Sequence, residues 1–231
     1  MIGLTIVVLL VLVAIFAPLL APQSYTATVA DKYQGPSTAH WLGTDGSGRD
    51  IASRLIYGAR ASLFVAFLVV LFALIAVIPL GLIAGYFGGW VDSIIMRFMD
   101  GLFTLPPLTL ALAVAALLGA SLRNAAIAIS IAFVPGFVRL LRALVLAIRE
   151  ETFVEASRSV GVNSRRMMRK HIFPNVVSPL IVQIALALGY AIGAEAGLSF
   201  LGFGLQPPNA SWGTMLQDGY NAINDTTWPL I

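Results

Sequence analysis

One stretch of the chain, Glu150–Asn175, carries the residues best suited to binding another protein. Thr152 lies three residues before Glu155, which is the spacing of a capping box: the threonine hydroxyl accepts from a free amide at the start of a helix, and the glutamate reaches back to the cap. Gly161 is placed to end this helix, because glycine readily takes the left-handed conformation that closes a helix. We therefore expect a short helix from Thr152 to about Val160, followed by a glycine turn.

A second, basic helix is expected after the glycine turn. Asn163 or Ser164 can cap its start, and it runs through His171. Pro174 then stands where the next hydrophobic segment opens, and proline is well tolerated in the first turn of a helix. The stretch is thus predicted to form two short helices held between two hydrophobic segments.

The surface of these two helices allows two interpretations. Phe153, Val154 and Val160 give the first helix apolar surface, and the second helix is rich in arginine. A basic amphipathic loop of this kind can lie on lipid headgroups. It can equally serve as a docking element for a cytoplasmic protein.

A second group of candidate residues lies in the last long hydrophobic segment. Glu195 is the acid deepest within a predicted span, and charges inside a membrane are costly and usually functional. Gln183 is one of the few other polar residues there. Gly189, Gly193 and Gly197 recur every four residues, a pattern that lets helices approach closely. We expect these residues to line a pathway, to be wetted near the outer end, to meet a neighbouring subunit or, for the glycines, simply to pack against another helix.

Several kinds of chemistry are missing from the sequence. The chain has no cysteine and two widely separated histidines, so neither thiolate catalysis nor a metal site built on these residues is expected. It has no GxxxxGK[ST] stretch with which to bind a nucleotide, and no HExxH or GxSxG pattern of a hydrolase. Its formal net charge of +3 is too small to indicate a nucleic-acid partner. We therefore expect a non-catalytic chain without a metal or cofactor of its own.

The composition of the whole chain indicates a membrane protein. Of its 231 residues, 58% are hydrophobic and 11% are charged, and the mean hydropathy is +0.89. A soluble domain is about 45–50% apolar and about 25% charged. Five segments approach the roughly 20 apolar residues that cross a bilayer. They are Ile2–Leu20, Ala61–Tyr86, Phe98–Leu118, Ala125–Ile148 and Val176–Phe203. Trp228–Ile231 is expected to be the start of a sixth span that is otherwise missing.

The distribution of lysine and arginine gives these spans a direction. Basic residues concentrate in the segment 149–171, and Arg97 lies in the loop two spans earlier, on the same side. Because basic loops favour the cytoplasm, we place this side and the N-terminus there. The expected organisation is a first transmembrane helix (1–20), an outer loop ending in an interfacial helix at Ser53–Arg60 (21–60), and a core (61–231) that contains the cytoplasmic loop 149–174.

Prolines interrupt three of the predicted spans, at Pro79, Pro106–Pro107 and Pro135. Each removes a backbone hydrogen bond and kinks its helix. Such breaks are tolerated in lipid only where neighbouring helices or a water-filled cavity satisfy the freed carbonyls. Kinked helices of this kind suit a bundle that lines a pathway.

The loop 149–174 resembles the EAA loop of ABC importer permeases. That motif reads EAA, three residues, G, nine residues, I, one residue, LP. The chain matches it with Glu155–Ser157, Gly161 and Ile172–Pro174. Three positions depart from the motif: Ser157 replaces the third alanine, His171 stands at the isoleucine position, and Phe173 replaces the leucine.

Other segments are similar to permeases of dipeptide, oligopeptide and nickel importers, and they follow in the same order along nearly the whole chain. The likeness is closest to the C permease subunits of dipeptide and oligopeptide importers. The segments are Gly43–Asp50, Tyr57–Arg60, Gly85–Asp92, Glu195–Gly202, Gln206–Pro208 and Ser211–Gly213.

This resemblance implies an all-α, polytopic membrane helix bundle with the type I ABC importer permease fold. It also implies that the loop is a coupling helix seated in a groove of a cytoplasmic ATPase, where the small Ala156 and Ser157 let the helix sit deep. The resemblance implies that the residues in contact with the ATPase are Glu155, Ala156, Ser157, Arg158, Gly161 and Arg165. Thr152 and Pro174 are expected to cap and support the helices of the loop.

The resemblance further implies a set of partners in a bacterial inner membrane. They are a second homologous permease, two cytoplasmic subunits or domains that bind ATP and Mg²⁺, and an external substrate-binding protein. The cargo is expected to be a di- or oligopeptide. A nickel or haem permease, or an ATP-independent channel or secondary carrier, remains the alternative.

Overall fold

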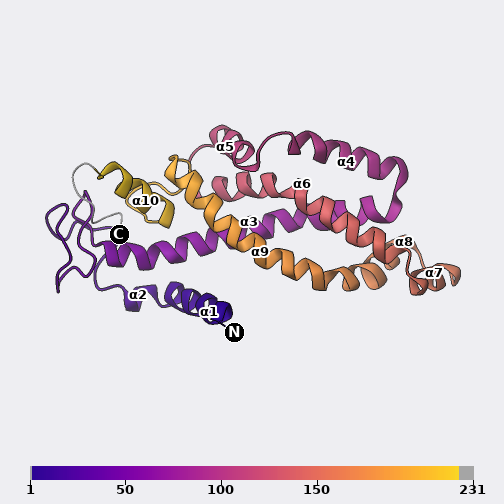
Figure 1. The fold of residues 1–231 in the computed structure, drawn as a ribbon, viewed down its shortest axis with the longest axis horizontal. Coiled ribbons are helices and arrows are strands. Elements are labelled where there is room, and N and C mark those ends of the chain that lie inside the picture. The colour runs from indigo at the N-terminus through magenta and orange to yellow at the C-terminus, as the bar shows by residue number, and fades with distance from the viewer. Residues whose placement is uncertain (1, 224–231) are drawn as a thin grey trace. The chain divides into compact units, whose positions relative to one another are not determined.

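The computed structural model describes residues 2–223 as an all-helical chain (Figure 1). Within these residues, β structure is limited to one isolated bridge between Thr44 and Asp50. The segment Trp228–Ile231, expected to open a sixth span, lies outside them. The helices are α1 (Ile2–Ile15), α2 (Ala17–Leu20), α3 (Ile51–Phe87), α4 (Gly89–Phe103), α5 (Pro107–Leu118), α6 (Leu122–Arg149), α7 (Thr152–Ser159), α8 (Ser164–Arg166), the π-helix η1 (Met167–Ile172), α9 (Phe173–Phe200) and α10 (Trp212–Asn221).

Three helices in the described part of the chain are long and apolar enough to cross a membrane: α3, α6 and the continuous segment Ser164–Phe200 that ends in α9. Helices α4 and α5 pass the same test together, but they are bent by 86° at the break between them. The expected span Phe98–Leu118, for which Pro106 and Pro107 predicted a kink, is therefore sharply broken. The break is explained by Pro106 and Pro107, because proline cannot continue the preceding helix and fits the first position of the next.

Two expected elements near the N-terminus also differ from the sequence prediction. The first span, Ile2–Leu20, is divided into α1 and α2 at Phe16, and Pro18 lies in the first turn of α2. The residues Ser53–Arg60 do not form a separate interfacial helix, since they are the opening turns of α3. Both Ser53 and Arg54 are buried there rather than turned to an interface.

The chain divides into two compact units. Unit 1 comprises residues 1–68, 114–126 and 191–231, and unit 2 comprises residues 69–113 and 127–190. Helices α3, α5, α6 and α9 contribute residues to both.

Unit 2 has a core built from α3, α6 and the residues that follow α6. Gly81 and Gly85 of α3 lie against α6, where an added Cβ would stand 2.8 Å from Leu141 and 2.6 Å from Val145. These two glycines therefore serve close packing of α3 on α6 within the chain. The fully buried members of this core are Val77, Val138, Leu141, Val145, Val154, Met167, Ile172 and Val176.

Candidate functional site

The first helix of the loop 149–174 begins differently from the capping box that the sequence predicts. Glu151 is the N-cap of α7, with no side-chain cap hydrogen bond, and Thr152 is already the first helical residue. Thr152 is thus one position too far along to cap the free amides. The Glu155 carboxylate makes no hydrogen bond or ion pair within the described chain, and its side chain is exposed. Glu155 is therefore available to a partner rather than occupied by its own helix.

The glycine turn forms as the sequence predicts. Gly161 has φ +81°, and its amide donates to Arg158 O at 3.0 Å. The next amide, of Val162, donates to Ser157 O at 3.2 Å. A side chain at position 161 would meet no neighbouring atom within 4 Å, so the requirement for glycine comes from the backbone conformation alone.

The second short helix is capped by Asn163, whose side chain accepts from the amide of Arg166 at 2.9 Å. It then passes through η1 into α9 without a break, so Pro174 lies inside the continuous helical segment Ser164–Phe200, as its eleventh residue, and does not open a new helix. Pro174 has no amide to donate, and the wider π-helical turn before it accommodates this loss. The Asn175 side chain donates to His171 O at 2.6 Å and supplies one extra bond there.

The loop is anchored to its own unit by buried apolar side chains. Val154 of α7 and Met167 and Ile172 of η1 are fully buried in the core of unit 2. Tyr86 adds a polar contact from α3: its hydroxyl lies 3.4 Å from the Ser164 hydroxyl, and the Arg158 guanidinium lies 5.9 Å from the centre of its ring. The two helices are therefore held on a packed support.

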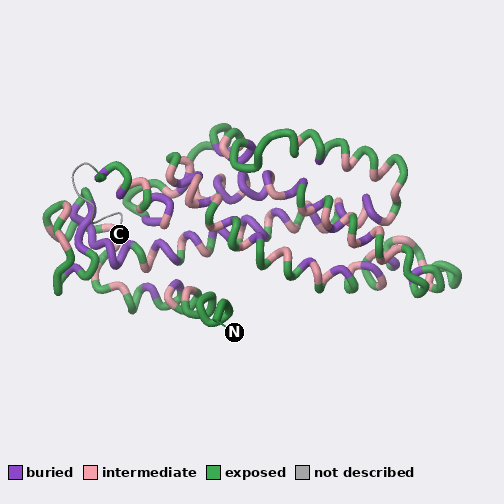
Figure 2. The backbone as a smooth tube through the Cα atoms, viewed as in Figure 1, coloured by how far each residue is buried: buried purple, intermediate pink, exposed green. Residues whose placement is uncertain are grey.

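The opposite face of the loop is exposed and lacks partners. Figure 2 shows exposed residues along most of α7. Phe153 in this helix is 40% exposed, and Val160, which follows it, is 80% exposed. Four basic side chains of α8 and η1 have no hydrogen bond or ion pair to any described residue. They are Arg165, Arg166, Arg169 and Lys170. Apolar groups and free cations on a supported helical turn suit a protein partner with acidic groups.

Helices α4 and α6, which lie side by side in Figure 1, are joined by two ion pairs. The Arg142 guanidinium donates two hydrogen bonds to the Asp92 carboxylate. Arg139 donates to Asp100 at 2.7 Å, and its guanidinium lies 4.6 Å from the centre of the Phe103 ring. Sequence reasoning did not identify these pairs. The signal was the presence of two acids in α4 that need partners.

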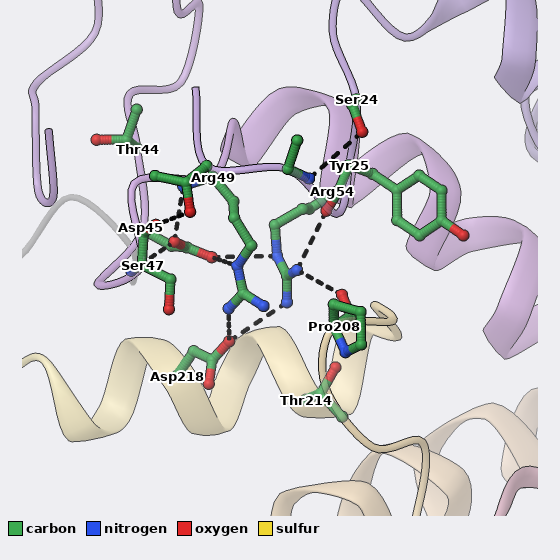
Figure 3. Close-up of polar contacts among 12 residues, drawn as sticks. Ser24, Tyr25, Thr44, Asp45, Ser47, Arg49, Arg54, Pro208, Thr214 and Asp218 are labelled. Atoms are coloured by element: carbon green, nitrogen blue, oxygen red, sulfur yellow. Dashed lines mark hydrogen bonds and ion pairs between the residues drawn. The ribbon is translucent and has the colours of Figure 1, made fainter. Parts of the chain in front are cut away.

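A cluster of buried charges ties together unit 1 (Figure 3). Arg49 Nε donates to Asp45 Oδ2 at 2.7 Å, and Arg54 Nε lies 3.3 Å from the same oxygen. Both guanidiniums also reach Asp218 Oδ2 of α10 at 3.4 Å. Arg54 further donates to the backbone carbonyl of Pro208 at 3.1 Å, so one arginine joins the loop, α3 and the segment before α10. The cluster explains the Gly43–Asp50 segment as a folded turn built around Asp45.

Next to this cluster, Asp50 closes the start of α3. It accepts from the Ser53 hydroxyl at 2.7 Å and from the Ser53 amide at 2.8 Å, and its other oxygen lies 3.0 Å from His40 Nδ1. The backbone amide of Gln23 then donates to the Ser53 hydroxyl at 3.0 Å. Every member of this chain of contacts has a partner, so it works as a structural support.

Glu195 lies in unit 1 and is buried, with 2% of its surface exposed. Its two oxygens accept from the hydroxyls of Ser62, at 2.9 Å, and Ser199, at 2.6 Å. The Trp212 amide donates in turn to Ser62 Oγ at 3.3 Å. Glu195 therefore links α9 to α3 and to the start of α10 within the chain.

The other candidates on α9 are not gathered around Glu195. Gly189 and Gly193 are exposed with open space beside them, and Gln183 and Gly197 are half-buried. The surface at Gly189 and Gly193 therefore packs against no other described helix. Across the described residues, no group of three or more His, Asp or Glu side chains is arranged to hold a metal ion.

Comparison with known proteins gives consistent results for sequence and fold. A family profile described as "binding-protein-dependent transport system inner membrane component" matches residues 77–230, and one described as "N-terminal TM domain of oligopeptide transport permease C" matches residues 1–36. A chain of the MetNI methionine ABC transporter, in an inward-facing conformation, aligns with a TM-score of 0.61 at 17% identity, over 77% of this chain and 85% of that one. The fold is therefore that of a type I ABC importer permease.

Among curated relatives, the dipeptide transport system permease protein DppC of Alkalihalophilus pseudofirmus is 47% identical over 231 residues, which is all of this chain and 76% of that protein. The glutathione transport system permease protein GsiD of Pectobacterium atrosepticum is 42% identical, over 92% of this chain and 71% of that protein. The chain belongs to the family of binding-protein-dependent transport system inner membrane components. It is thus a multi-pass membrane permease subunit of an ABC transporter, which is a non-catalytic kind of chain.

Proposed function

We propose that this permease carries di- or oligopeptides into the cell. It would act with a second homologous permease, two cytoplasmic ATP-binding subunits or domains and an external substrate-binding protein. The relatives support a peptide cargo, because their names assign them to dipeptide, glutathione and D,D-dipeptide transport. Nickel and haem, the other cargos considered from the sequence, have no counterpart among these names.

The observation that carries the proposal is the two-sided construction of the loop 149–174. Its inner side is fixed in the core of unit 2 through Val154, Met167 and Ile172. Its outer side offers Glu155, exposed apolar groups and unpaired cations. An element that only rested on lipid headgroups would not need an exposed carboxylate among its cations.

This construction suits the transmission of force from an ATPase. To move a gate decisively between closed and open, a partner must supply about 5.5 kcal/mol of bias. Because α7 is packed against helices of unit 2, a displacement of the loop moves its support as a rigid body rather than being absorbed by a slack connection. ATP and Mg²⁺ would bind to the partner subunits.

The interpretation of the loop 149–174 as an ATPase-docking element also gives the orientation of the chain in the membrane. We assign the loop 149–174 and the N-terminus to the cytoplasm and the loop 21–50 to the outside. The unpaired cations of α8 and η1 support this assignment, since unpaired basic residues favour the cytoplasmic side.

A charge reversal at an exposed arginine tests the proposal. Arg165→Glu should weaken docking of the ATPase by about tenfold, the loss expected for one charge-assisted hydrogen bond. Arg123→Glu is the matched control, because Arg123 is also exposed and unpaired among the described residues but lies at the other end of α6. The assay is ATP hydrolysis stimulated by the binding protein, and uptake of labelled alanyl-alanine, in vesicles containing the complete importer.

The outcomes separate the parts of the proposal. Normal hydrolysis and uptake in Arg165→Glu would show that the loop does not couple to the ATPase through this face. An importer that hydrolyses ATP with its binding protein but accumulates no peptide would disprove the peptide cargo.

A further inference from the structure

The ion pair between Asp100 of α4 and Arg139 of α6 is unusually exposed for its position. Its side chains are 59% and 45% exposed, whereas the neighbouring Asp92 and Arg142 are 15% and 29% exposed. Asp100 lies eleven residues after the first residue of α4, and Arg139 lies ten residues before the last residue of α6. At 1.5 Å per residue, Arg139 stands about 15 Å inside α6. Asp100 lies three residues before the last residue of α4, close to the break between α4 and α5. Both residues belong to helices that are apolar enough to cross a membrane, α6 by itself and α4 together with α5.

Charged side chains at this depth do not face lipid. They turn toward other protein or toward a water-filled cavity, because exposure to hydrocarbon is too costly. The exposed side of this pair must accordingly face a polar environment in the assembled importer.

The exposed surface of α4 near the pair is largely apolar and carries a few polar groups. A groove of about 620 Å³ runs along the exposed side of α4. It includes Ser93, Arg97 and Gly101, which follow one another at four-residue spacing, and the Arg97 side chain has no partner among the described residues. Phe98 adds an apolar wall, and Phe103 lies beneath the Arg139 guanidinium. The groove thus combines charge with apolar surface, as ligand sites do.

We propose that Asp100 and Arg139 form a cargo-contact site on the wall of the translocation pathway, an inference that rests on the proposed transport of peptides. A free peptide carries an ammonium group at one end and a carboxylate at the other. Asp100 accepts hydrogen bonds from the ammonium group, and Arg139 donates to the carboxylate. The ion pair between the two residues opens, and each residue then binds one end of the peptide.

The exposure of the pair favours peptide over a fixed protein contact. An exposed ion pair contributes little net stability, so an incoming zwitterion displaces it easily and leaves again as the pair re-forms. A pathway needs this property, since its sites must bind cargo without retaining it. The more buried Asp92–Arg142 pair holds α4 to α6 throughout.

Cysteine accessibility tests whether the surface is wet. The chain contains no cysteine, so a single introduced thiol is unique within it. Gly101→Cys places a thiol beside Asp100 where no atom obstructs it, and Met99→Cys places one at a buried position of the same helix as a control. In the complete importer, a charged methanethiosulfonate reagent should modify Gly101→Cys quickly and Met99→Cys very slowly. An unreactive Gly101→Cys would overturn the inference.

Protection of the same thiol tests the cargo contact without the binding protein. Added alanyl-alanine should slow modification of Gly101→Cys, and its C-terminal amide should do so less well. Arg139→Gln or Asp100→Asn should raise the half-protecting concentration of alanyl-alanine by about tenfold, the loss of one charge-assisted bond. Arg139→Lys should recover part of the protection because it restores the charge. Arg123→Gln, on the same helix, should leave protection unchanged.

Two results would overturn the cargo site while leaving the proposed function intact. One is an importer that accumulates peptide although alanyl-alanine never protects the thiol. The other is equal protection in the parent, Arg139→Gln and Asp100→Asn proteins. Failure of the parent importer to accumulate any peptide would instead remove the proposed function itself.

Discussion

Two regions of this permease use charge in opposite ways. In unit 1, Arg49 and Arg54 are buried and share two carboxylates, Asp45 and Asp218. In the loop 149–174, the basic side chains of α8 and η1 have no partner within the described chain. A buried charge must be paired to be tolerated, whereas an exposed charge is solvated by water and remains free to bind another protein. The first region therefore maintains the fold, and the second is suited to contact with another subunit.

The two regions also differ in how far apart in the sequence their members lie. The cluster of unit 1 connects segments far apart in sequence, so removing a member disturbs several elements at once. The loop is one continuous stretch, and its exposed side chains can be changed without altering its buried supports Val154, Met167 and Ile172. Mutations in the two regions should consequently separate loss of stability from loss of coupling.

The largest effect is expected from Arg54→Met. The substitution leaves Asp45 and Asp218 with a weaker counter-charge and frees the Pro208 carbonyl. Removing one partner of a buried ion pair costs about 3–5 kcal/mol. Thermal unfolding of the purified complex in detergent should show the loss. Arg60→Met, at an exposed and unpaired arginine of the same helix, is the control; equal behaviour of the two variants would contradict the structural role of the cluster.

A smaller effect is expected from Glu195→Ala. It leaves the buried Ser62 hydroxyl and the Ser199 hydroxyl without their acceptor, which costs about 1–3 kcal/mol. The matched change in the loop is Glu155→Ala, which removes an exposed carboxylate and should alter stability by less than about 0.5 kcal/mol. We expect Glu155→Ala to lower stimulated ATP hydrolysis instead. If it destabilised the complex as much as Glu195→Ala, the distinction between the two acids would fail.

Gly161→Val sharpens the comparison through the backbone. Valine at φ +81° costs about 1–3 kcal/mol of strain, and the structure can relieve it by opening the turn between α7 and α8. The complex should remain assembled in the membrane while uptake and stimulated ATP hydrolysis fall. Gly189→Val, at an exposed glycine within α9, controls for the added side chain. Undiminished uptake in Gly161→Val would remove the turn from the coupling mechanism.

Local features of the loop were predictable from sequence because short-range chemistry determines them. The Gly161 turn and the Asn163 cap depend on residues within a few positions of each other. The capping box was wrong because the helix starts one residue earlier than expected, and Thr152 and Glu155 retain the spacing without the register. The continuous helix through Pro174 was missed because a π-helical turn has no clear sequence signature.

The charged clusters could not have been predicted in the same way. Arg54 meets Asp218 across 164 positions of sequence, and Ser62 meets Glu195 across 133. One sequence shows which charges need partners, but the packing of helices decides which of them meet. The same limit applies to the bend between α4 and α5: the prolines indicate a break, whereas its angle depends on tertiary contacts.

The smallest effect is expected from the pH dependence of Asp218. Burial raises the pKa of this carboxyl, and the nearby Arg54 and Arg49 lower it by less. A carboxyl whose pKa is higher in the folded state stabilises the fold when it is protonated, below its unfolded pKa of about 3.9. That contribution is lost as the pH rises through the folded pKa. The stability of the parent protein relative to Asp218→Asn should therefore fall as the pH rises above about 4, and only weakly, because the Asp218 side chain is 38% exposed.

Unfolding midpoints of the two proteins in the same detergent, measured at several pH values, check this sign. Asp31→Asn, at an exposed carboxyl outside the cluster, shows how much of the trend belongs to unpaired surface acids. A parent protein that instead gained stability over Asp218→Asn with rising pH would mean that the two arginines dominate over burial. The cluster would then be a net attraction at neutral pH, and the contrast with the unpaired cations of the loop would be one of binding strength as well as of exposure.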